Sequence, residues 1–341
     1  MAFTPGEGSP QTLMTPMTRS TDTMRGLWLE NGEIVLRDDL PRPQPAAGEA
    51  LIRTRLAGIC GTDVQLLRGY YDYVGVPGHE FVGEVVEAGP QSALNGRRVV
   101  GSINIGCGSC DFCARGDPRH CSRRRVLGIH SHPGVFAEYF TLPLENLQVV
   151  PDGVDDQDAV FTEPLAAALH ITEQVVIERD TRVLIVGAGK LGQLIAMVMA
   201  LHTDRLAVVV RHPGQHGLLE AQGIEVLDTS GLGTRQWDVV IESSGSPSGM
   251  GTALAHIKPT GTVVIKSTYK DDVALPLSRV VVDEITLVGS RCGPFAPALE
   301  LLRHEQVAPH RLIAHTYPLS DADQAFEAAL QPGAGKVLLS F

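Results

Sequence analysis

The sequence predicts a two-domain α/β protein that combines a doubly wound parallel sheet of six strands with a second, β-rich domain. Three observations lead to this prediction. A glycine motif lies between an apolar strand and an apolar helix, strands and helices alternate after residue 163, and short strands and turns fill residues 25–150. A chain of 341 residues is long enough for two domains.

The first part of the chain shows strand patterns separated by turn residues. Residues 26–36 predict a hairpin with a turn at Asn31-Gly32. Residues 49–58 alternate like a half-buried strand, and residues 81–89 and 97–102 predict two more strands. Residues 1–23 are rich in Thr, Pro, Ser and Gly and lack the basic start and apolar stretch of a secretory signal, so we expect a disordered extension.

The second part alternates between strand and helix patterns, which favours a doubly wound sheet. The predicted strands are 183–186, 206–210, 224–227, 238–241, 262–266 and 285–289. The chain then returns to the first domain through a helix at 296–304, the segment 314–319, a helix at 320–330 and a strand at 336–339.

The glycine motif predicts a dinucleotide site. Gly187-x-Gly189-x-x-Gly192 follows the apolar run 183–186 and opens an apolar helix. The first glycine makes the turn, the second lets a pyrophosphate approach, and the third allows close packing of helix on strand. The phosphates would lie at the helix N-terminus, against Lys190 and Leu191.

Four cysteines within fifteen residues predict a structural zinc site. Four thiolates fill a tetrahedral shell and leave no open position, while nearby glycines (Gly106, Gly108, Gly116) let the loop turn tightly. Disulfides are disfavoured without a secretory signature, and an iron–sulfur cluster remains an alternative. The four residues are Cys107, Cys110, Cys113 and Cys121.

A second metal set is spread along the chain. Cys60 lies in Cys-Gly-Thr-Asp, His79 and Glu80 lie in Gly-His-Glu, and Glu163 lies in Glu-Pro-Leu. One thiolate, one imidazole and two carboxylates can bind a zinc that keeps a position for water or substrate. Each residue alone is more often a core, surface or capping residue, and the combination carries the prediction.

The order of these motifs resembles the zinc-dependent medium-chain dehydrogenase/reductase superfamily, which includes alcohol, sorbitol and threonine dehydrogenases. The resemblance runs from about Met24 to Phe341. It implies a GroES-like catalytic domain at 24–162 and 293–341, with a zinc lobe at about 106–122, and a Rossmann domain at 163–292. Glu163-Pro-Leu is more typical of the polyol and threonine branches than of the classical alcohol dehydrogenases, which carry a cysteine there.

The resemblance also implies a mechanism in which a bound zinc polarises an alcohol or carbonyl oxygen. Cys60 and His79 rank first as ligands, Glu163 next and Glu80 last, and Asp63 would take the second hydrogen bond of His79 unless it is a turn or cap residue. Thr62 stands where the family places the hydroxyl that takes the substrate proton.

The family's proton relay continues to a histidine, but this chain has Gln65, whose neutral amide cannot act as a base near pH 7. The proton could instead leave Thr62 through water or the cofactor ribose. Other candidate bases are Glu80, Glu163, His130 and His132.

The nucleotide preference is predicted from the end of the second sheet strand. By the family's spacing, Arg211 occupies the acidic position that would hold the ribose 2′-OH of NAD. An arginine can bind a 2′-phosphate, with His212 adding charge, so NADP(H) is favoured over NAD(H); stacking of Arg211 on the adenine is the alternative. Ser243, Ser290 and Arg291 follow later strands and are further candidate cofactor contacts.

Composition limits the partners. A net charge of −11 argues against nucleic acid, and no apolar run is long enough to span a membrane. We expect a cytoplasmic homodimer or homotetramer that pairs through the last sheet strand, carries two zinc ions per chain, and oxidises a secondary alcohol, polyol, sugar or amino alcohol (EC 1.1.1.-). Tyr70, Tyr71 and Tyr73 could line its pocket or simply pack. The alternatives are a redox-neutral zinc enzyme, suggested by Gln65, and a nucleotide-binding protein without catalysis.

Overall fold

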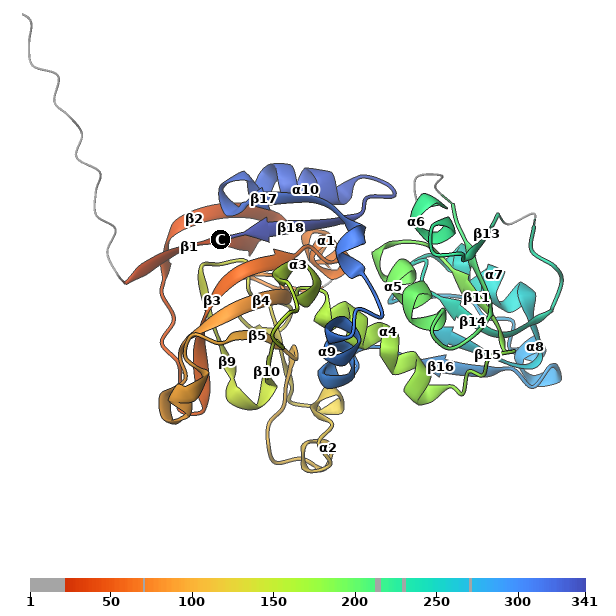
Figure 1. Cartoon of the computed structure of the whole chain (residues 1–341), viewed down its shortest axis with the longest axis horizontal. Helices are drawn as coiled ribbons and strands as arrows, with labels where there is room; N and C mark the ends of the chain where they lie inside the picture. Colours follow the sequence, from red (N-terminus) through yellow and green to blue (C-terminus); the bar gives the residue numbers. More distant parts are fainter. Residues whose placement is uncertain (1–21, 70, 212–215, 229–230, 270–271) are drawn as a thin grey trace, which may run out of the picture.

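The computed structural model describes residues 22–69, 71–211, 216–228, 231–269 and 272–341. Two lobes lie side by side, with α4 (Thr162–Gln174) and α9 (Phe295–Arg303) between them (Figure 1). The first strand begins at Thr23, so nearly all of the predicted extension 1–23 lies outside the described residues.

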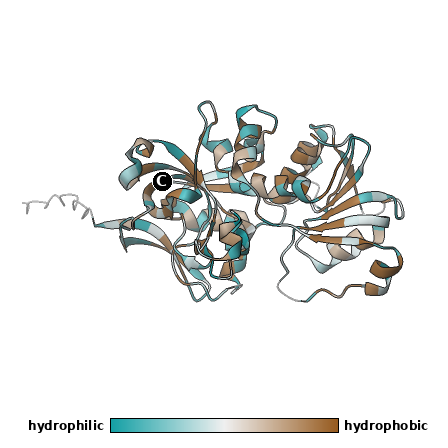
Figure 2. Ribbon diagram, turned by 90° about the horizontal axis from the view of Figure 1, so that it is seen from below, coloured by the Kyte–Doolittle hydropathy of each residue, from teal (hydrophilic) through white to brown (hydrophobic). Residues whose placement is uncertain are grey.

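One lobe is built on the predicted sheet of six parallel strands, in the order β13-β12-β11-β14-β15-β16. The strand order reverses on either side of β11, so a crevice forms at its carboxyl end, where the glycine motif follows. The strands are the brown layer of this lobe in Figure 2, because β-branched and apolar residues face helices on both sides. The strands are β11 (Arg182–Val186), β12 (Arg205–Val209), β13 (Glu225–Leu227), β14 (Trp237–Glu242), β15 (Ile257–Ile265) and β16 (Thr286–Gly289), and the helices are α5 (Lys190–Met199), α6 (His216–Glu220), α7 (Pro247–His256) and α8 (Leu277–Val282).

The other lobe is the predicted β-rich domain. Its main sheet has the order β10-β5-β4-β3-β18-β17, and β9 also pairs with β3. The predicted hairpin is present, and both Asn31 and Gly32 have positive φ angles, as its two-residue turn requires. The strands are β1 (Thr23–Glu30), β2 (Glu33–Pro41), β3 (Glu49–Gly58), β4 (Glu80–Glu87), β5 (Arg98–Gly101), β6 (Asn104–Ile105), β7 (Arg125–Leu127), β8 (Ser131–His132), β9 (Tyr139–Pro143), β10 (Leu147–Val149), β17 (Ile313–Pro318) and β18 (Lys336–Ser340), and the helices are α1 (Gly61–Leu67), α2 (Asp111–Ala114), α3 (Asp156–Ala159) and α10 (Ala322–Leu330).

The chain passes between the lobes twice. It leaves the β-rich domain through α4 and returns after β16 through α9, and β18 then pairs with β3. A single apolar cluster joins the two lobes, with Phe161 and Leu165 near the start of α4, Leu194 in α5 and Leu299 in α9. Most boundaries of the nucleotide sheet differ from the prediction by one residue, and the largest difference is at β15, which begins at Ile257 rather than at residue 262. A 3₁₀ turn at Leu319–Asp321 precedes α10.

Candidate active site and metal centres

Three of the predicted catalytic-metal residues meet beside the first crossing. Cys60 is the N-cap of α1, and Glu80 begins β4 directly after His79. The antiparallel pairing of β3 with β4 places Gly58 opposite Glu80, which brings the end of one strand to the start of the other. One ligand atom each from Cys60, His79 and Glu80 lies within 4.8 Å of the other two.

Asp63 serves this set in two ways. Its Oδ2 accepts the Cys60 N–H at 2.8 Å, which caps α1, and its Oδ1 lies 3.4 Å from Nδ1 of His79. Burial lowers the pKa of His79, but Asp63 and Cys60 more than offset this effect and raise that pKa well above its ordinary value. The carboxylate thus faces one ring nitrogen and leaves Nε2 for a metal.

Glu80 also has a cationic partner. Lys336, at the start of β18, donates from Nζ to Oε2 of Glu80, and both side chains are buried. Burial disfavours the ammonium, yet Glu80 and Cys60 raise the pKa of Lys336. The pairing fixes one carboxylate oxygen and leaves the other for the metal set.

Glu163 lies in the first turn of α4 and outside the group whose ligand atoms are within 4.8 Å. Burial raises the pKa of Glu163, while His79 acts in the opposite direction. The sequence ranks Glu163 ahead of Glu80 as a ligand, whereas Glu80 is the carboxylate that joins Cys60 and His79 in the close group. The strand pairing of Glu80 with Gly58, which the sequence does not reveal, is the cause.

The donor chemistry of this set fits zinc. A thiolate, an imidazole and a carboxylate are three ligands, and a fourth position stays open, as in catalytic zinc sites. Nδ1 of His79 and Oδ1 of Asp63 are buried without an aligned hydrogen bond among the described residues. A metal at Nε2 would hold the imidazole neutral and let Nδ1–H turn toward Asp63.

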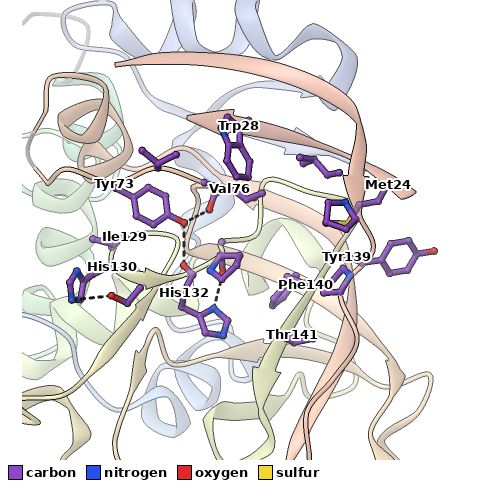
Figure 3. Close-up of a pocket in the computed structure, with 18 of the residues that line it drawn as sticks. Met24, Trp28, Tyr73, Val76, Ile129, His130, His132, Tyr139, Phe140 and Thr141 are labelled. Atoms are coloured by element: carbon purple, nitrogen blue, oxygen red, sulfur yellow. Dashed lines mark hydrogen bonds between the residues drawn. The ribbon is translucent and has the colours of Figure 1, made fainter. Parts of the chain in front are cut away.

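The proton-relay candidates separate into two places. The Thr62 Oγ1 lies 3.7 Å from Sγ of Cys60, and Gln65 is half-buried in the same helix α1. His130 and His132 line a different, open cavity of about 800 Å³, between the β1–β2 hairpin, residues 71–76, residues 129–134 and residues 139–141. Nδ1–H of His132 donates to the Pro133 carbonyl at 2.8 Å, and burial lowers the pKa of His132 (Figure 3).

Two of the predicted pocket tyrosines line that same cavity. Tyr71 is one of its lining residues. The Tyr73 hydroxyl donates to the Val76 carbonyl at 2.7 Å, with the His132 carbonyl at 3.2 Å (Figure 3). Tyr70 lies outside the described residues.

The four-cysteine lobe has the predicted form. Ligand atoms of Cys107, Cys110, Cys113 and Cys121 lie within 4.8 Å of one another, and all six cysteines of the chain are free thiols, so the disulfide alternative is wrong. Gly108 and Gly116 have positive φ angles, and a Cβ on Gly106 would lie 2.7 Å from Sγ of Cys113. A four-sulfur shell with no open position fits a structural zinc.

The three glycines of the motif have the geometry that a dinucleotide site requires. Gly187 has φ +107°, and a Cβ there would lie 2.7 Å from the backbone of Ser244. A Cβ on Gly192 would lie 1.9 Å from the Gly187 carbonyl, so only glycine lets α5 pack on β11. Gly189 faces open space and is the N-cap of α5.

Of the side chains around the motif, Ser243 and Leu191 support the fold, whereas Lys190 lies near the catalytic-metal set. Ser243 donates to the Gly187 carbonyl at 3.0 Å, and Leu191 packs partly buried against the apolar cluster. Burial lowers the pKa of Lys190 and Lys336 lowers it further, whereas Cys60 and Glu80 act against them. The Lys190 ammonium is therefore close enough to the catalytic-metal set for the charges of Cys60 and Glu80 to raise its pKa.

A groove of about 520 Å³ runs from the motif past the end of β12. Arg211 lines it, and its Nη2 donates to Oγ of Ser248, at the start of α7, at 3.3 Å. Asp228, which follows β13, lines the same groove. Asp228 is not among the cofactor residues expected from the sequence, because the expected acidic position is at the end of the second strand. His212 lies outside the described residues.

Ser290 and Arg291 occupy the start of the return crossing. Oγ of Ser290 accepts from Nζ of Lys266 at 3.3 Å, and Nη2 of Arg291 donates to Oδ1 of the buried Asn104 at 2.8 Å. Lys266 lies at the end of a predicted strand, as Ser290 does, but no local pattern points to the partners of Lys266 or Lys336, because these partners are distant in the chain.

Comparison with known proteins agrees with this geometry. The model of the alcohol dehydrogenase GroES-like domain matches residues 46–152, and that of the zinc-binding dehydrogenase domain matches residues 218–304. A sorbitol dehydrogenase of Halalkalibacterium halodurans is 31% identical over 88% of this chain and 94% of its own length.

Two solved structures extend the comparison. A zinc-binding dehydrogenase from Sinorhizobium meliloti bound to NADP has a TM-score of 0.86 at 30% identity, covering 94% of this chain and 99% of that one. An Escherichia coli alcohol dehydrogenase in complex with NADH has a TM-score of 0.87 at 27% identity, covering 94% and 100%.

A GroES-like domain, a parallel nucleotide sheet and a Cys-His-Glu set between them define a zinc- and NAD(P)-dependent dehydrogenase of alcohols. The chain belongs to the zinc-binding medium-chain alcohol dehydrogenase family. The zinc-binding dehydrogenase model and the dehydrogenase relatives favour an oxidoreductase over the redox-neutral and non-catalytic alternatives. No helix among the described residues is long and apolar enough to cross a membrane.

Proposed function

We propose that the chain interconverts the secondary alcohol of a polyol or related hydroxylated substrate and its ketone, with NADP(H) as the hydride carrier. The observation that carries the proposal is the position of the Cys60–His79–Glu80 set, whose charges reach Lys190 at the start of α5. This nearness of the metal donors to the first residue of the nucleotide-binding helix supports hydride transfer between a metal-bound substrate and the nucleotide. The similarity to a sorbitol dehydrogenase supports a polyol substrate.

The roles follow from the contacts. Cys60, His79 and Glu80 would hold zinc, which when bound supplies Lewis-acid stabilisation of an alkoxide. Asp63 orients His79, and Thr62, beside Cys60, offers a hydroxyl to the substrate proton. A Gln65 amide cannot continue the relay.

Glu163 is the group that we propose as the proton acceptor beyond Thr62. It lies outside the close metal set, and burial raises the pKa of its carboxyl, which suits a group that takes up and releases a proton. His130 and His132 line the separate cavity and are less suitable.

Two matched variants test these assignments. Glu80→Gln should lower the zinc content from two to about one per chain by mass spectrometry, because it removes a direct ligand. Glu163→Gln should keep both zinc ions and lose activity on a panel of polyols by a factor of about 10² or more, with an altered pH profile. Loss of zinc in Glu163→Gln with full zinc in Glu80→Gln would reverse the assignment.

Arg211 is the residue that we propose for NADP preference. Its guanidinium lines the nucleotide groove, where a 2′-phosphate could bind to it and to Ser248. Asp228 in the same groove disfavours a phosphate, so the nucleotide preference is tested by titrating the protein with NADPH and with NADH. Arg211→Ala should weaken NADPH about tenfold or more and leave NADH nearly unchanged by fluorescence titration. Tighter NADH binding in the wild type would contradict the proposal.

A further inference from the structure

The two crossings between the domains lie directly against each other. Residues 290–294, which join β16 to α9 and are called the return segment below, run along α4. A Cβ on Gly293 would lie 2.0 Å from the Ala166 carbonyl, so the return segment approaches the α4 backbone closely. Any change in the angle between domains must move these two segments together.

Lys266, at the carboxyl end of β15, bridges them from the nucleotide domain. Its Nζ donates to the Ala167 carbonyl of α4 at 2.8 Å and to the Arg291 carbonyl of the return segment at 2.9 Å, and Oγ of Ser290 lies at 3.3 Å. Three acceptors match the three donors of an ammonium group. Lys266 is only 9% exposed, and no carboxylate is within ion-pair distance of it in the described ranges.

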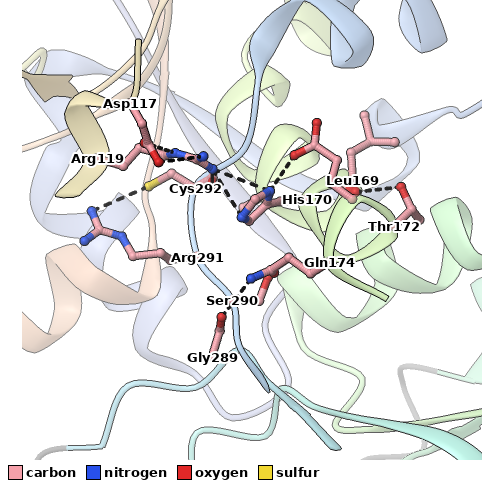
Figure 4. Close-up of polar contacts among 12 residues, drawn as sticks. Asp117, Arg119, Leu169, His170, Thr172, Gln174, Gly289, Ser290, Arg291 and Cys292 are labelled. Atoms are coloured by element: carbon pink, nitrogen blue, oxygen red, sulfur yellow. Dashed lines mark hydrogen bonds and ion pairs between the residues drawn. The ribbon is translucent and has the colours of Figure 1, made fainter. Parts of the chain in front are cut away.

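Arg119 bridges the same two segments from the catalytic domain (Figure 4). Its Nη1 donates to the Cys292 carbonyl at 2.8 Å and to Nε2 of His170 in α4 at 3.2 Å. Nδ1–H of His170 donates to Glu173 at 2.6 Å, which leaves Nε2 as the acceptor. The guanidinium is held in turn by Asp117, with Nε at 2.7 Å from Oδ1.

We propose that Arg119 and Lys266 are positioning residues that together clamp α4 to the return segment and so fix the angle at which the nucleotide domain faces the metal set. Both side chains are cations that donate hydrogen bonds to backbone carbonyls. Hydrogen bonds from a charged donor are stronger than those from a neutral donor. Ala167 lies one helical turn after Glu163, so the Lys266 bond also fixes Glu163 relative to the nucleotide sheet.

Arg119 belongs to the four-cysteine lobe, which gives that lobe a role in the clamp. It lies in the 3₁₀ turn Pro118–His120, between Cys113 and Cys121. The fold of the lobe therefore determines where the guanidinium meets the two crossings.

The test is NADPH and NADH binding by fluorescence titration of full-length Arg119→Met, Lys266→Met and the double variant. Each single variant should bind the preferred nucleotide about tenfold more weakly. The double variant should bind the nucleotide only slightly more weakly than each single variant does. Both residues connect α4 to the return segment, so losing the second adds little once the first is gone. Amide hydrogen exchange should rise in α4 and the return segment while β11 stays protected.

Two control variants remove the same type of side chain from the same parts of the structure, but at positions outside the clamp. Lys258→Met removes another lysine of β15, which pairs with Asp238, and Arg115→Met removes another arginine of the lobe, which lies over the Phe112 ring. Both should bind nucleotide like the wild type, and Arg119→Lys should recover part of the affinity. Unchanged affinity in both clamp variants, additive losses, or equal losses in the controls would overturn the proposal. If Lys266→Met does not fold, Lys266→Gln takes its place.

Discussion

The ion pair between Lys336 and Glu80 is the residue-scale feature on which the metal set depends most. Both side chains are buried, so removing the cation leaves a carboxylate without its partner. Lys336→Met should lower the free energy of unfolding by about 3–5 kcal/mol, measured by urea titration of protein whose catalytic site is free of zinc. The double variant Lys336→Met/Glu80→Gln should recover at least half of that loss, since the unpaired charge is gone. A single-variant loss below about 1 kcal/mol would contradict this account.

Lys266 gives the stability a pH dependence whose sign can be stated. Burial lowers the pKa of Lys266 from 10.5 to about 8, and Cys292 and Glu163 offset only part of that effect. Between these pH values the unfolded chain holds a proton that the folded chain has released, so this group makes stability rise with pH. The slope is at most about 1.4 kcal/mol per pH unit. Below pH 8 the folded and the unfolded chain both hold the proton, so Lys266 adds nothing to the slope there.

Unfolding in urea from pH 7 to pH 10 measures that slope. The wild type should gain stability relative to Lys266→Met as the pH rises above 8. A difference between the two proteins that does not depend on pH would show that Lys266 stays charged in the fold.

At the scale of elements, the turn between β11 and α5 offers a matched pair of variants. A Cβ on Gly192 would collide with the Gly187 carbonyl, whereas one on Gly189 would meet open space. Gly192→Ala should therefore lower the free energy of unfolding by about 1–3 kcal/mol or prevent folding. Gly189→Ala should change it by less than about 1 kcal/mol and weaken nucleotide binding at least tenfold. Equal effects of the two variants on stability and binding would contradict the assignment.

The elements that the sequence predicts well are those with a local pattern. The parallel strands, the Asn31-Gly32 turn and the four-cysteine lobe each depend on residues close together in the chain. Glu80 and Lys336 are 256 residues apart, so no local pattern could show that they pair or that Glu80, rather than Glu163, joins Cys60 and His79 in the close group. Asp228 could not be predicted for a similar reason. It follows β13, and the sequence does not reveal that β13 lies next to β12 in the sheet.

At the scale of the whole molecule, one edge of the nucleotide sheet is left uncovered. β16 pairs with β15 and with no other strand among the described residues. The neighbouring helix α8 exposes Val281 at 74% and Val282 at 80%, and it is the brown helix at the far end of that lobe in Figure 2. An unpaired edge beside exposed apolar side chains is typical of a surface that pairs across a two-fold axis.

The expectation of a homodimer can therefore be tested at this surface. Val281→Glu places a charge where an isologous contact would bury it opposite its own copy, so the mass measured by light scattering at micromolar concentration should fall toward that of one chain. Val35→Glu changes a valine of similar kind on β2, 48% exposed in the other domain, and should leave the mass unchanged. A monomeric wild type, or a dimer that survives Val281→Glu and dissociates in Val35→Glu, would place the contact elsewhere. Because Val281 is an exposed residue of α8 and lines neither the nucleotide groove nor the clamp, Val281→Glu should keep the nucleotide affinity of the wild type even as it separates the subunits.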